Sequence, residues 1–355
     1  MRHHLFVAML VCCLFYSLFG MAEANKKKEI VLLNWSEYMD PELLQQFEKK
    51  TGIHVREVNF ETDETRDELL TRTGGKGFDL FVVSGERVQS YVNRKWLARL
   101  DTRLLPNTKH IAPRWITAYP DLEKFAVPIF WGTLGIGYRT DLVADNITKW
   151  QQLLQPAEKL RQRIVMEKES RDLMGVAMKI QGHTWNHYEE AAIEQAEKLL
   201  MAQKPFVRAY GYPSLDKTSG LVTGEVWMAM LYNGDAISLK ELEPRIDYVV
   251  PEEGTMLWVD CLVVLESSPR KAMAYAFIDF LHEPDNAAQL AHHLHYATVN
   301  QAAELLLKPE HKNNPVIYPP DAILKRSEFL IKPPPQIDRR FKEILRGLLN
   351  ESIPQ

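Results

Sequence analysis

Apolar and polar positions follow a regular rhythm along the first part of the chain. Residues 30–33 form a short apolar run typical of a buried strand, and "IHVREVNF" (53–60) and "FDLFVV" (78–83) also have strand patterns. Helical patterns separate these strands, at 40–52 and 62–77. Strand, helix, strand, helix and strand in this order predict a parallel, doubly wound α/β sheet.

The first of these helices has clear end signals. Asp40 is a good N-cap residue, Pro41 suits the first turn, and Gly52 suits the end of a helix. Leu43 and Phe47 fall on one face, which we expect to be buried.

The same alternation continues downstream. Further strands are expected at 125–128, 135–138, 163–166, 226–232 and 258–265, and further helices at 188–201, 270–282 and 284–293. The glycines of "GTLGIG" (132–137) indicate a hairpin near a hinge.

The length of 355 residues predicts about two domains. Because no Pro/Ser-rich linker separates them, we expect two lobes joined by strands that cross between them. The expected division is 25–135 plus 260–304 for lobe 1, and 136–259 plus 305–355 for lobe 2.

The first 24 residues have the pattern of a secretory signal peptide. Arg2 precedes an apolar run at 5–19, and "AEA" (Ala22–Ala24) supplies small residues for cleavage after Ala24. We therefore expect an exported mature chain. It would retain Cys261 alone of the three cysteines, so it could form no internal disulfide.

The net charge of the chain argues against some classes of binding partner. The net charge is −4, and removing residues 1–24 takes away one basic and one acidic residue, so it stays at −4. This balance offers no basic footprint for nucleic acid or anionic lipid.

Aromatic and acidic side chains gather in the loops that follow strands. "NWSEYMDP" (34–41) places Trp35, Ser36, Glu37 and Tyr38 directly after a buried strand, and Ser84 follows "FDLFVV". In open α/β sheets, ligands bind just beyond the carboxyl ends of the strands. These side chains are therefore expected to line a crevice.

Similar clusters recur elsewhere. "LYNGD" (231–235) follows a strand, Trp258 and Asp260 alternate so that both face one side of a strand, and Glu169 and Asp172 are three apart. Carboxylates form charge-assisted hydrogen bonds with ammonium groups, and aromatic faces attract cations and cover methylenes. The recurrence favours a cationic ligand with an apolar body, such as an alkyl polyamine.

The residues also resemble a known family. "NWSEYMDPELLQQFEKKTGIHV", "FDLFVVS", "VPIFWGTLGIGYRTD", "GEVWMAMLYNG", "EEGTMLWVDCLVV" and "HYATVNQAA" resemble, in order and spacing, the periplasmic binding proteins for putrescine and spermidine. The resemblance implies a two-lobed α/β fold of the type II binding proteins, with a hinge and, in each lobe, a mixed sheet flanked by helices. It also implies a periplasmic, monomeric receptor without cofactor or metal.

The resemblance implies a ligand-binding set as well. The matching positions are Trp35, Ser36, Glu37, Tyr38, Ser84, Glu169, Asp172, Trp258, Asp260 and Tyr296. Trp35 and Tyr38 would form one aromatic wall, and Asp260 would hold an inner amine.

Two positions of the expected set depart from the spermidine binders. Glu86 stands where they have a tyrosine, and Tyr232 where they have a tryptophan. These departures favour the signalling branch typified by the norspermidine sensor, which acts through an inner-membrane sensor protein. The substrate-binding component of an ABC permease is the alternative, and the preferred polyamine stays open between putrescine, spermidine and norspermidine.

The hypothesis that the protein is an enzyme has weaker support. Cys261 lies in an expected strand and suits a core thiol better than a nucleophile. His183 and His187 lack the glutamate of a zincin motif, and "HHLH" (292–295) lacks a local carboxylate partner for a metal. An exported glycoside hydrolase is the remaining alternative, but the aromatic–acid pairs are spread over too many strand ends for one scissile bond.

Overall fold

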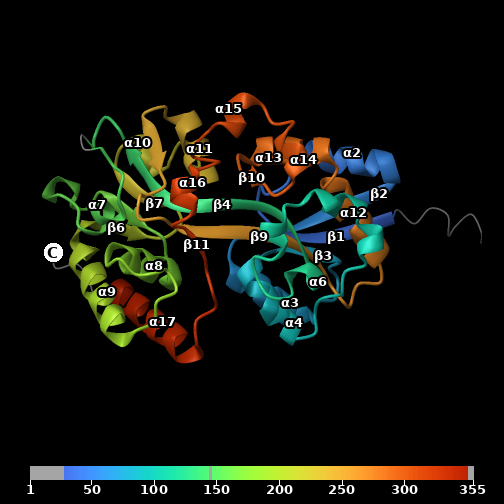
Figure 1. The fold of residues 1–355 in the computed structure, drawn as a ribbon, viewed down its shortest axis with the longest axis horizontal. Coiled ribbons are helices and arrows are strands. Elements are labelled where there is room, and N and C mark those ends of the chain that lie inside the picture. Colours follow the sequence, from blue (N-terminus) through green and yellow to red (C-terminus); the bar gives the residue numbers. More distant parts are fainter. Residues whose placement is uncertain (1–27, 144–145, 351–355) are drawn as a thin grey trace, which may run out of the picture.

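The computed structural model describes residues 28–143 and 146–350, and these form two lobes that lie side by side (Figure 1). The strands are β1 (Lys28–Trp35), β2 (Ile53–Phe60), β3 (Leu80–Ser84), β4 (Ala126–Arg139), β5 (Ile164–Met166), β6 (Val207–Tyr210), β7 (Met228–Tyr232), β8 (Ile246–Val249), β9 (Met256–Val264), β10 (Ala297–Thr298) and β11 (Glu328–Phe329). The predicted signal peptide, residues 1–24, lies outside the described residues.

The strands form one mixed, continuous path across both lobes. Its order is β2-β1-β3-β9-β4-β7-β5-β6. At one end β1 runs parallel to β2 and β3, and at the other β5 runs parallel to β6 and β7. In the middle β4 and β9 are antiparallel to each other. The parallel pattern predicted from the sequence is thus confirmed at the first end, and the central strands make each lobe's sheet mixed.

Helices flank the sheet in both lobes (Figure 1). The α-helices of at least ten residues are α2 (Pro41–Thr51), α3 (Asp63–Thr73), α8 (Ser170–Ile180), α9 (Glu190–Gln203), α11 (Asn233–Leu242), α12 (Lys271–Leu281), α13 (Pro284–Leu294) and α17 (Pro335–Asn350). The shorter α-helices are α4 (Val88–Asn93), α5 (Pro113–Ile116), α6 (Leu122–Phe125), α7 (Trp150–Leu154), α10 (Gly220–Thr223), α14 (Gln301–Glu304), α15 (Pro309–Lys312) and α16 (Asp321–Leu324). Short 3₁₀ turns occur at η1 (Gly85–Arg87), η2 (Thr102–Leu104), η3 (Pro106–His110), η4 (Glu158–Leu160) and η5 (Lys204–Phe206). In one lobe α17 packs on α8 and α9, and in the other α12 packs on α2.

The end signals of α2 operate as the sequence predicts. The Asp40 carboxylate accepts a hydrogen bond from the backbone N–H of Glu42, and Gly52 ends the helix in the left-handed region at φ 71°. Leu43 and Phe47 are buried. The helix therefore holds residues 36–40, the loop in front of it, at a fixed place beside the sheet.

The predicted hairpin at 132–137 is wrong. These residues belong to β4, which runs without a turn from Ala126 to Arg139. Its glycines serve close packing instead. A Cβ on Gly132 would lie 2.3 Å from the side chains of Trp258 and Asn233, and one on Gly135 would lie 2.5 Å from Tyr248.

β4 exchanges partners along its length. Residues 126–133 pair with β9, and residues 134–139 pair with β7 and β8. β4 and β9 are therefore the strands that cross between the lobes, as Figure 1 shows. On this basis we propose the division of 25–135 plus 260–304 and 136–259 plus 305–355, referred to below as lobe 1 and lobe 2.

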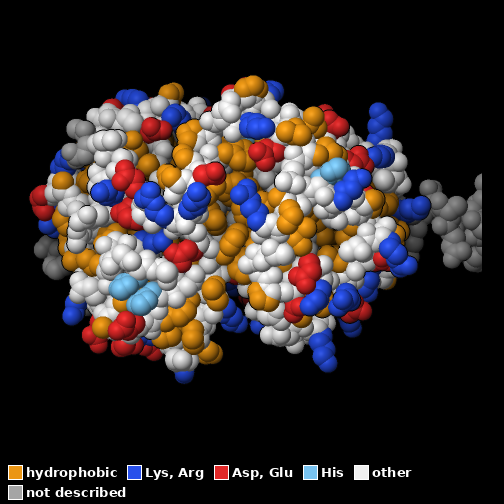
Figure 2. Space-filling view, viewed as in Figure 1, with side chains coloured by type: hydrophobic (Ala, Val, Ile, Leu, Met, Phe, Trp, Pro, Cys, Tyr) orange, Lys and Arg blue, Asp and Glu red, His pale blue; other side chains and the backbone are white. Residues whose placement is uncertain are grey.

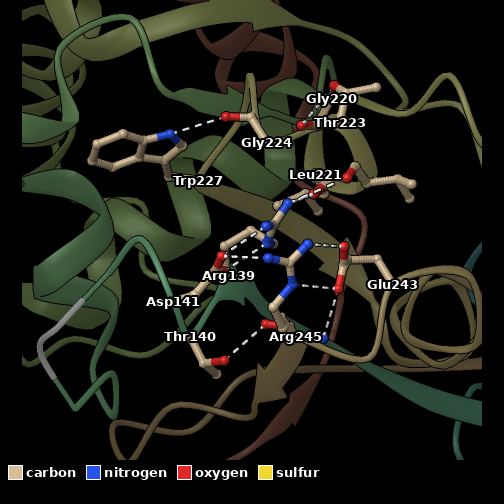
Figure 3. Close-up of polar contacts among 11 residues, drawn as sticks. Arg139, Thr140, Asp141, Gly220, Leu221, Thr223, Gly224, Trp227, Glu243 and Arg245 are labelled. Atoms are coloured by element: carbon tan, nitrogen blue, oxygen red, sulfur yellow. Dashed lines mark hydrogen bonds and ion pairs between the residues drawn. The ribbon is translucent and has the colours of Figure 1, made fainter.

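An ion-pair network fixes the far end of β4 in lobe 2 (Figure 3). Arg139 is paired with Asp141 at 2.9 Å and donates to the carbonyl of Leu221, while Arg245 contacts Asp141 at 3.1 Å. The same guanidinium of Arg245 donates to Glu243 and lowers the pKa of that carboxyl group to about 2. These contacts hold β8 and α10 against β4, so the crossing strand is anchored in lobe 2.

The face shown in Figure 2 carries basic and acidic side chains interspersed over both lobes. Within residues 28–143 and 146–350, no helix combines the length and apolar character needed to cross a bilayer.

Candidate ligand-binding site

The lobe 1 side of the candidate site is centred on Asp260. Asp260 lies opposite Ser84 where β9 pairs with β3, and the Ser84 hydroxyl donates to its carboxylate. The Tyr38 hydroxyl donates to Asp260 Oδ2 at 2.8 Å. Because Tyr38 follows β1, three strands bring these side chains together.

A row of aromatic rings leads from Tyr38 into lobe 2. The centroids of Tyr38 and Tyr296 are 5.7 Å apart, and Trp258 meets Tyr296 edge-on at 4.8 Å. Tyr232 then contacts Trp258 at 6.4 Å, and Tyr212 stacks on Tyr232 at 6.4 Å. Such spacings are typical of stabilising aromatic pairs. The row therefore spans both lobes.

Two glycines allow this close packing. Gly132 lets the Trp258 indole lie against β4, as described above. A Cβ on Gly234 would lie 2.3 Å from the Tyr296 ring, so a larger residue there would displace the ring. The glycine of "LYNGD" thus has a packing role in the site.

The lobe 2 side contains three buried carboxylates. Glu167, Asp172 and Asp235 are 4%, 4% and 5% exposed. Glu167 follows β5 directly, Asp172 lies in the first turn of α8, and Asp235 lies in the first turn of α11 after β7. Because β5 and β7 are parallel neighbours, their carboxyl ends deliver these side chains to the same edge.

Tyrosine hydroxyls partner the buried aspartates. Tyr232 donates to Asp172 Oδ2 at 3.3 Å, and both Tyr212 and Tyr296 donate to Asp235. The positive ends of α8 and α11 also favour acidic groups in their first turns. These neutral donors orient the carboxylates but leave their negative charge uncompensated.

Burial is the main cause of raised pKa values among these carboxylates. Burial, followed by the charge of Glu169, raises the pKa of Asp172 to about 7. Burial also raises the pKa of Asp235 to about 6 and that of Asp260 to about 6. The pKa of Glu167 lies well above its usual value because of burial, and then because of the nearby Asp172.

No basic side chain among the described residues neutralises these groups by direct contact. Within residues 28–143 and 146–350, the four carboxylates Glu167, Asp172, Asp235 and Asp260 form no ion pair with lysine, arginine or histidine. The Nε1 of Trp258 and the Oε1 of Glu167 are buried there without a hydrogen-bond partner. Buried carboxylates of one sign, one of them with a free acceptor oxygen on Glu167, favour the binding of a cation.

The structure places part of the predicted set apart from this row. Trp35 packs on Phe60, with ring centroids 4.4 Å apart. Ser36 is exposed and donates to Glu61, and Glu37 is exposed with φ 57°. Trp35 is the last residue of β1, and Ser36 and Glu37 lie on the following loop that also carries Tyr38. The contacts described above do not include these three residues.

The acidic pair of lobe 2 is divided. Asp172 belongs to the buried cluster, whereas Glu169 is exposed at the N-cap of α8 and acts through its charge on Asp172.

Glu86 is placed differently from the other predicted residues. Its carboxylate lies 2.6 Å from the guanidinium of Arg171, which belongs to α8 in lobe 2. The side chains are 12% and 19% exposed. Glu86 thus joins the two lobes through an ion pair.

Sequence reasoning missed Glu167, Tyr212 and Asp235. A signal existed for two of them, because Asp235 ends "LYNGD" and Glu167 is the first residue after a strand in the acidic stretch "MEKESRD". Tyr212 had none, since it follows β6, which the sequence pattern did not predict.

The residues weighed for other chemistry lie elsewhere. Cys261 is fully buried in β9, and burial raises the pKa of its thiol. His183 and His187 stack on each other at 4.0 Å. In the part of the chain that the structure describes, no cluster of three or more His, Cys, Asp or Glu side chains is suited to hold a metal ion.

The fold and the site together define a class of protein. Two α/β lobes joined by crossing strands, with a polar and aromatic site between them, are the architecture of a two-lobed, type II solute-binding protein. The chain belongs to the bacterial extracellular solute-binding protein family, whose model matches residues 42–318.

Two proteins with names that state a ligand are similar to the chain over most of its length. The chain is 30% identical over 310 residues to the spermidine/putrescine-binding periplasmic protein of Escherichia coli (strain K12). This match covers 87% of this chain and 88% of the E. coli protein. The chain is 32% identical over 295 residues to the norspermidine sensor of Vibrio cholerae serotype O1, covering 82% of this chain and 81% of the sensor.

A solved structure agrees with this assignment. The spermidine/putrescine ABC transporter substrate-binding protein PotD from Streptococcus pneumoniae superposes with a TM-score of 0.82 at 27% identity, covering 91% of this chain and 98% of that one.

Proposed function

We propose that the protein is a periplasmic receptor that binds a linear polyamine between its two lobes. This proposal rests on the aromatic row of Tyr38, Tyr296, Trp258, Tyr232 and Tyr212. Carboxylates lie along the row, and within the described part of the chain they form no ion pair with a basic side chain. The names of the E. coli and V. cholerae relatives support the same ligand class.

The chemistry of the row suits an alkyl polyamine. Each ammonium group carries donors for a carboxylate, and each charge-assisted hydrogen bond is stronger than a neutral one. The methylenes between nitrogens lie against the aromatic faces, where a desolvated cation gains about 1–2 kcal/mol per ring. Closure of the lobes removes water and strengthens these contacts.

The predicted residues outside the row keep a place in this proposal. Trp35 ends β1, and Ser36 and Glu37 lie on the same loop as Tyr38. We propose that these three residues cover the ligand at the edge of the site. Glu86 would then act through the contact between lobes. The protein is proposed to act as a monomer and without catalysis.

Calorimetric titration tests the ligand class. Mature protein would be unfolded, stripped of ligand, refolded and titrated with diamines and triamines, with amino acids and sugars as controls. Saturable binding of polyamines alone is expected, together with a rise in the unfolding temperature. Binding of a control ligand in their place would overturn the proposal.

We further propose that the receptor serves signalling rather than uptake, with an inner-membrane sensor protein as partner. The support is the pair of departures from spermidine binders at Glu86 and Tyr232 and the likeness to the norspermidine sensor. Uptake of labelled polyamine in cells with and without the gene decides between the roles. Unchanged uptake is expected, and loss of uptake would make the protein a transport component.

A further inference from the structure

Glu167 is a buried carboxylate that the expected site does not include. It is the first residue after β5 and is 4% exposed. Its Oε1 has no hydrogen-bond partner in the described part of the protein, and the backbone of Lys168 supplies the hydrogen bond to the carboxylate. A buried polar atom without a hydrogen-bond partner lowers the stability of the folded state, so the presence of Glu167 at this position needs an explanation.

The charges that act most strongly on Glu167 within the described residues have its own sign. They belong to Asp172, Asp235 and Glu169. Elsewhere the chain compensates a buried carboxylate, because Asp79 is paired with Arg270 at 2.9 Å and accepts from Ser268. The absence of such compensation at Glu167 concentrates negative charge at one end of the site.

The two ends of the site are unequal. Lobe 1 contributes Asp260, whereas lobe 2 contributes Glu167, Asp172 and Asp235. One ammonium group near Asp260 would balance the charge of that carboxylate. A single ammonium group in lobe 2, in contrast, would leave excess negative charge there in a buried setting. A second ammonium group in lobe 2 removes most of that excess.

We propose that Glu167 is a specificity-determining residue, which with Asp235 and Asp172 lets lobe 2 hold two ammonium groups and so selects alkyl amines with three cationic nitrogens over those with two. This inference rests on the proposed polyamine-binding function. It assigns the extra nitrogen to the end of the site at β5 and β7.

Glu167→Gln tests the inference because it keeps the shape and removes the charge. Norspermidine or spermidine, and putrescine as the diamine, would be titrated into ligand-stripped protein. We expect the Kd for the triamine to rise about tenfold or more and that for putrescine to change less than about threefold. Equal changes for both amines, or no change for the triamine, would overturn the inference.

Glu158→Gln is a matched control. Glu158 is in lobe 2, is 73% exposed and pairs with Arg161, so its removal changes the same charge outside the site. Both affinities should stay as in the wild type. If Glu158→Gln lowers triamine affinity as much as Glu167→Gln, the effect is one of net charge and the inference fails.

Stability measurements separate folding from binding. Ligand-free Glu167→Gln should unfold at the wild-type temperature or above it, since it relieves repulsion among buried carboxylates. A variant that unfolds much earlier would assign Glu167 a structural role and overturn the inference. If the wild-type protein binds neither amine, the proposed function itself is overturned. If the wild-type protein binds the amines and Glu167→Gln binds them with the same affinities, this inference alone is overturned.

Discussion

The guanidinium of Arg171 lies 2.6 Å from the carboxylate of Glu86, and the two residues belong to different lobes. Arg171 also donates to the carbonyl of Ile331 at 3.0 Å. On the lobe 1 side, Arg87 contacts both Glu86 and Asp63. A chain of alternating charges thus runs into lobe 1 from the contact between the lobes.

This relationship predicts that Glu86→Gln favours an open arrangement of the lobes. Because the pair is largely buried, its loss should weaken ligand binding by about 1–2 kcal/mol, roughly five- to thirtyfold. Calorimetry would measure the affinity, and small-angle scattering the opening.

The double variant shows whether Glu86 works through Arg171. If it does, Glu86→Gln, Arg171→Gln and the combination of both should have similar effects. Additive losses would instead indicate that Glu86 contacts the ligand directly, as the sequence alone suggested. The exposed pair of Lys240 and Asp247 serves as control, and its removal should leave binding unchanged.

Asp260→Asn should abolish most of the ligand affinity. The change leaves the donors Tyr38 and Ser84 in place but removes the charge that would balance an inner ammonium group. We expect a loss of about 3 kcal/mol, roughly a hundredfold in Kd by calorimetry. Asp247→Asn, which removes an exposed carboxylate, should bind normally; wild-type affinity in Asp260→Asn would exclude this residue from the site.

Ligand affinity should rise with pH between about 5.5 and 8. The raised pKa of Asp172, about 7, and those of Asp235 and Asp260, about 6, mean that these groups hold protons near pH 6 without ligand. A polyamine favours their charged forms, so binding releases protons. Each strongly shifted group should contribute roughly a tenfold change over this range. Titrations in two buffers of different ionisation enthalpy measure the release, and pH-independent binding would contradict it.

The ligand-free protein should show the opposite trend in stability. A carboxyl group whose pKa is raised by folding stabilises the folded state below its unfolded pKa, near 4. That contribution is lost as the pH rises through about 6 to 7, the folded values for these aspartates. Thermal unfolding of ligand-free protein should therefore show a decline in this window that added polyamine reduces. A decline of equal size with saturating polyamine would show that these carboxylates do not meet the ligand.

Gly132→Ala should disturb both stability and binding. The new Cβ would lie 2.3 Å from the Trp258 ring and from Asn233 Oδ1, and neither can move without shifting the site. We expect a loss of about 1–3 kcal/mol in the free energy of unfolding, as for other overpacked positions. Gly347→Ala in α17 is the control, since its Cβ would meet nothing within 4 Å and should stabilise the helix slightly. Equal denaturation curves for the two variants would refute the packing role.

Local signals in the sequence are enough to specify several elements of the fold. Asp40, Pro41 and Gly52 set the ends of α2 through capping and backbone freedom, which depend on neighbouring residues alone. Trp258 and Asp260 belong to one strand, as alternation predicted. The aromatic and acidic residue types at strand ends likewise predict a cationic ligand.

Other features depend on contacts between side chains that are distant in the sequence. The glycines of "GTLGIG" resemble a turn in sequence, yet Gly132 and Gly135 lie inside β4 because rings from other elements occupy the space of their missing Cβ atoms. Glu86 and Arg171 meet across the lobes, although nothing local relates them. The acidic cluster around Glu167 likewise exists because two parallel strands end at one edge. Burial there, rather than residue type, raises the pKa values of its carboxylates.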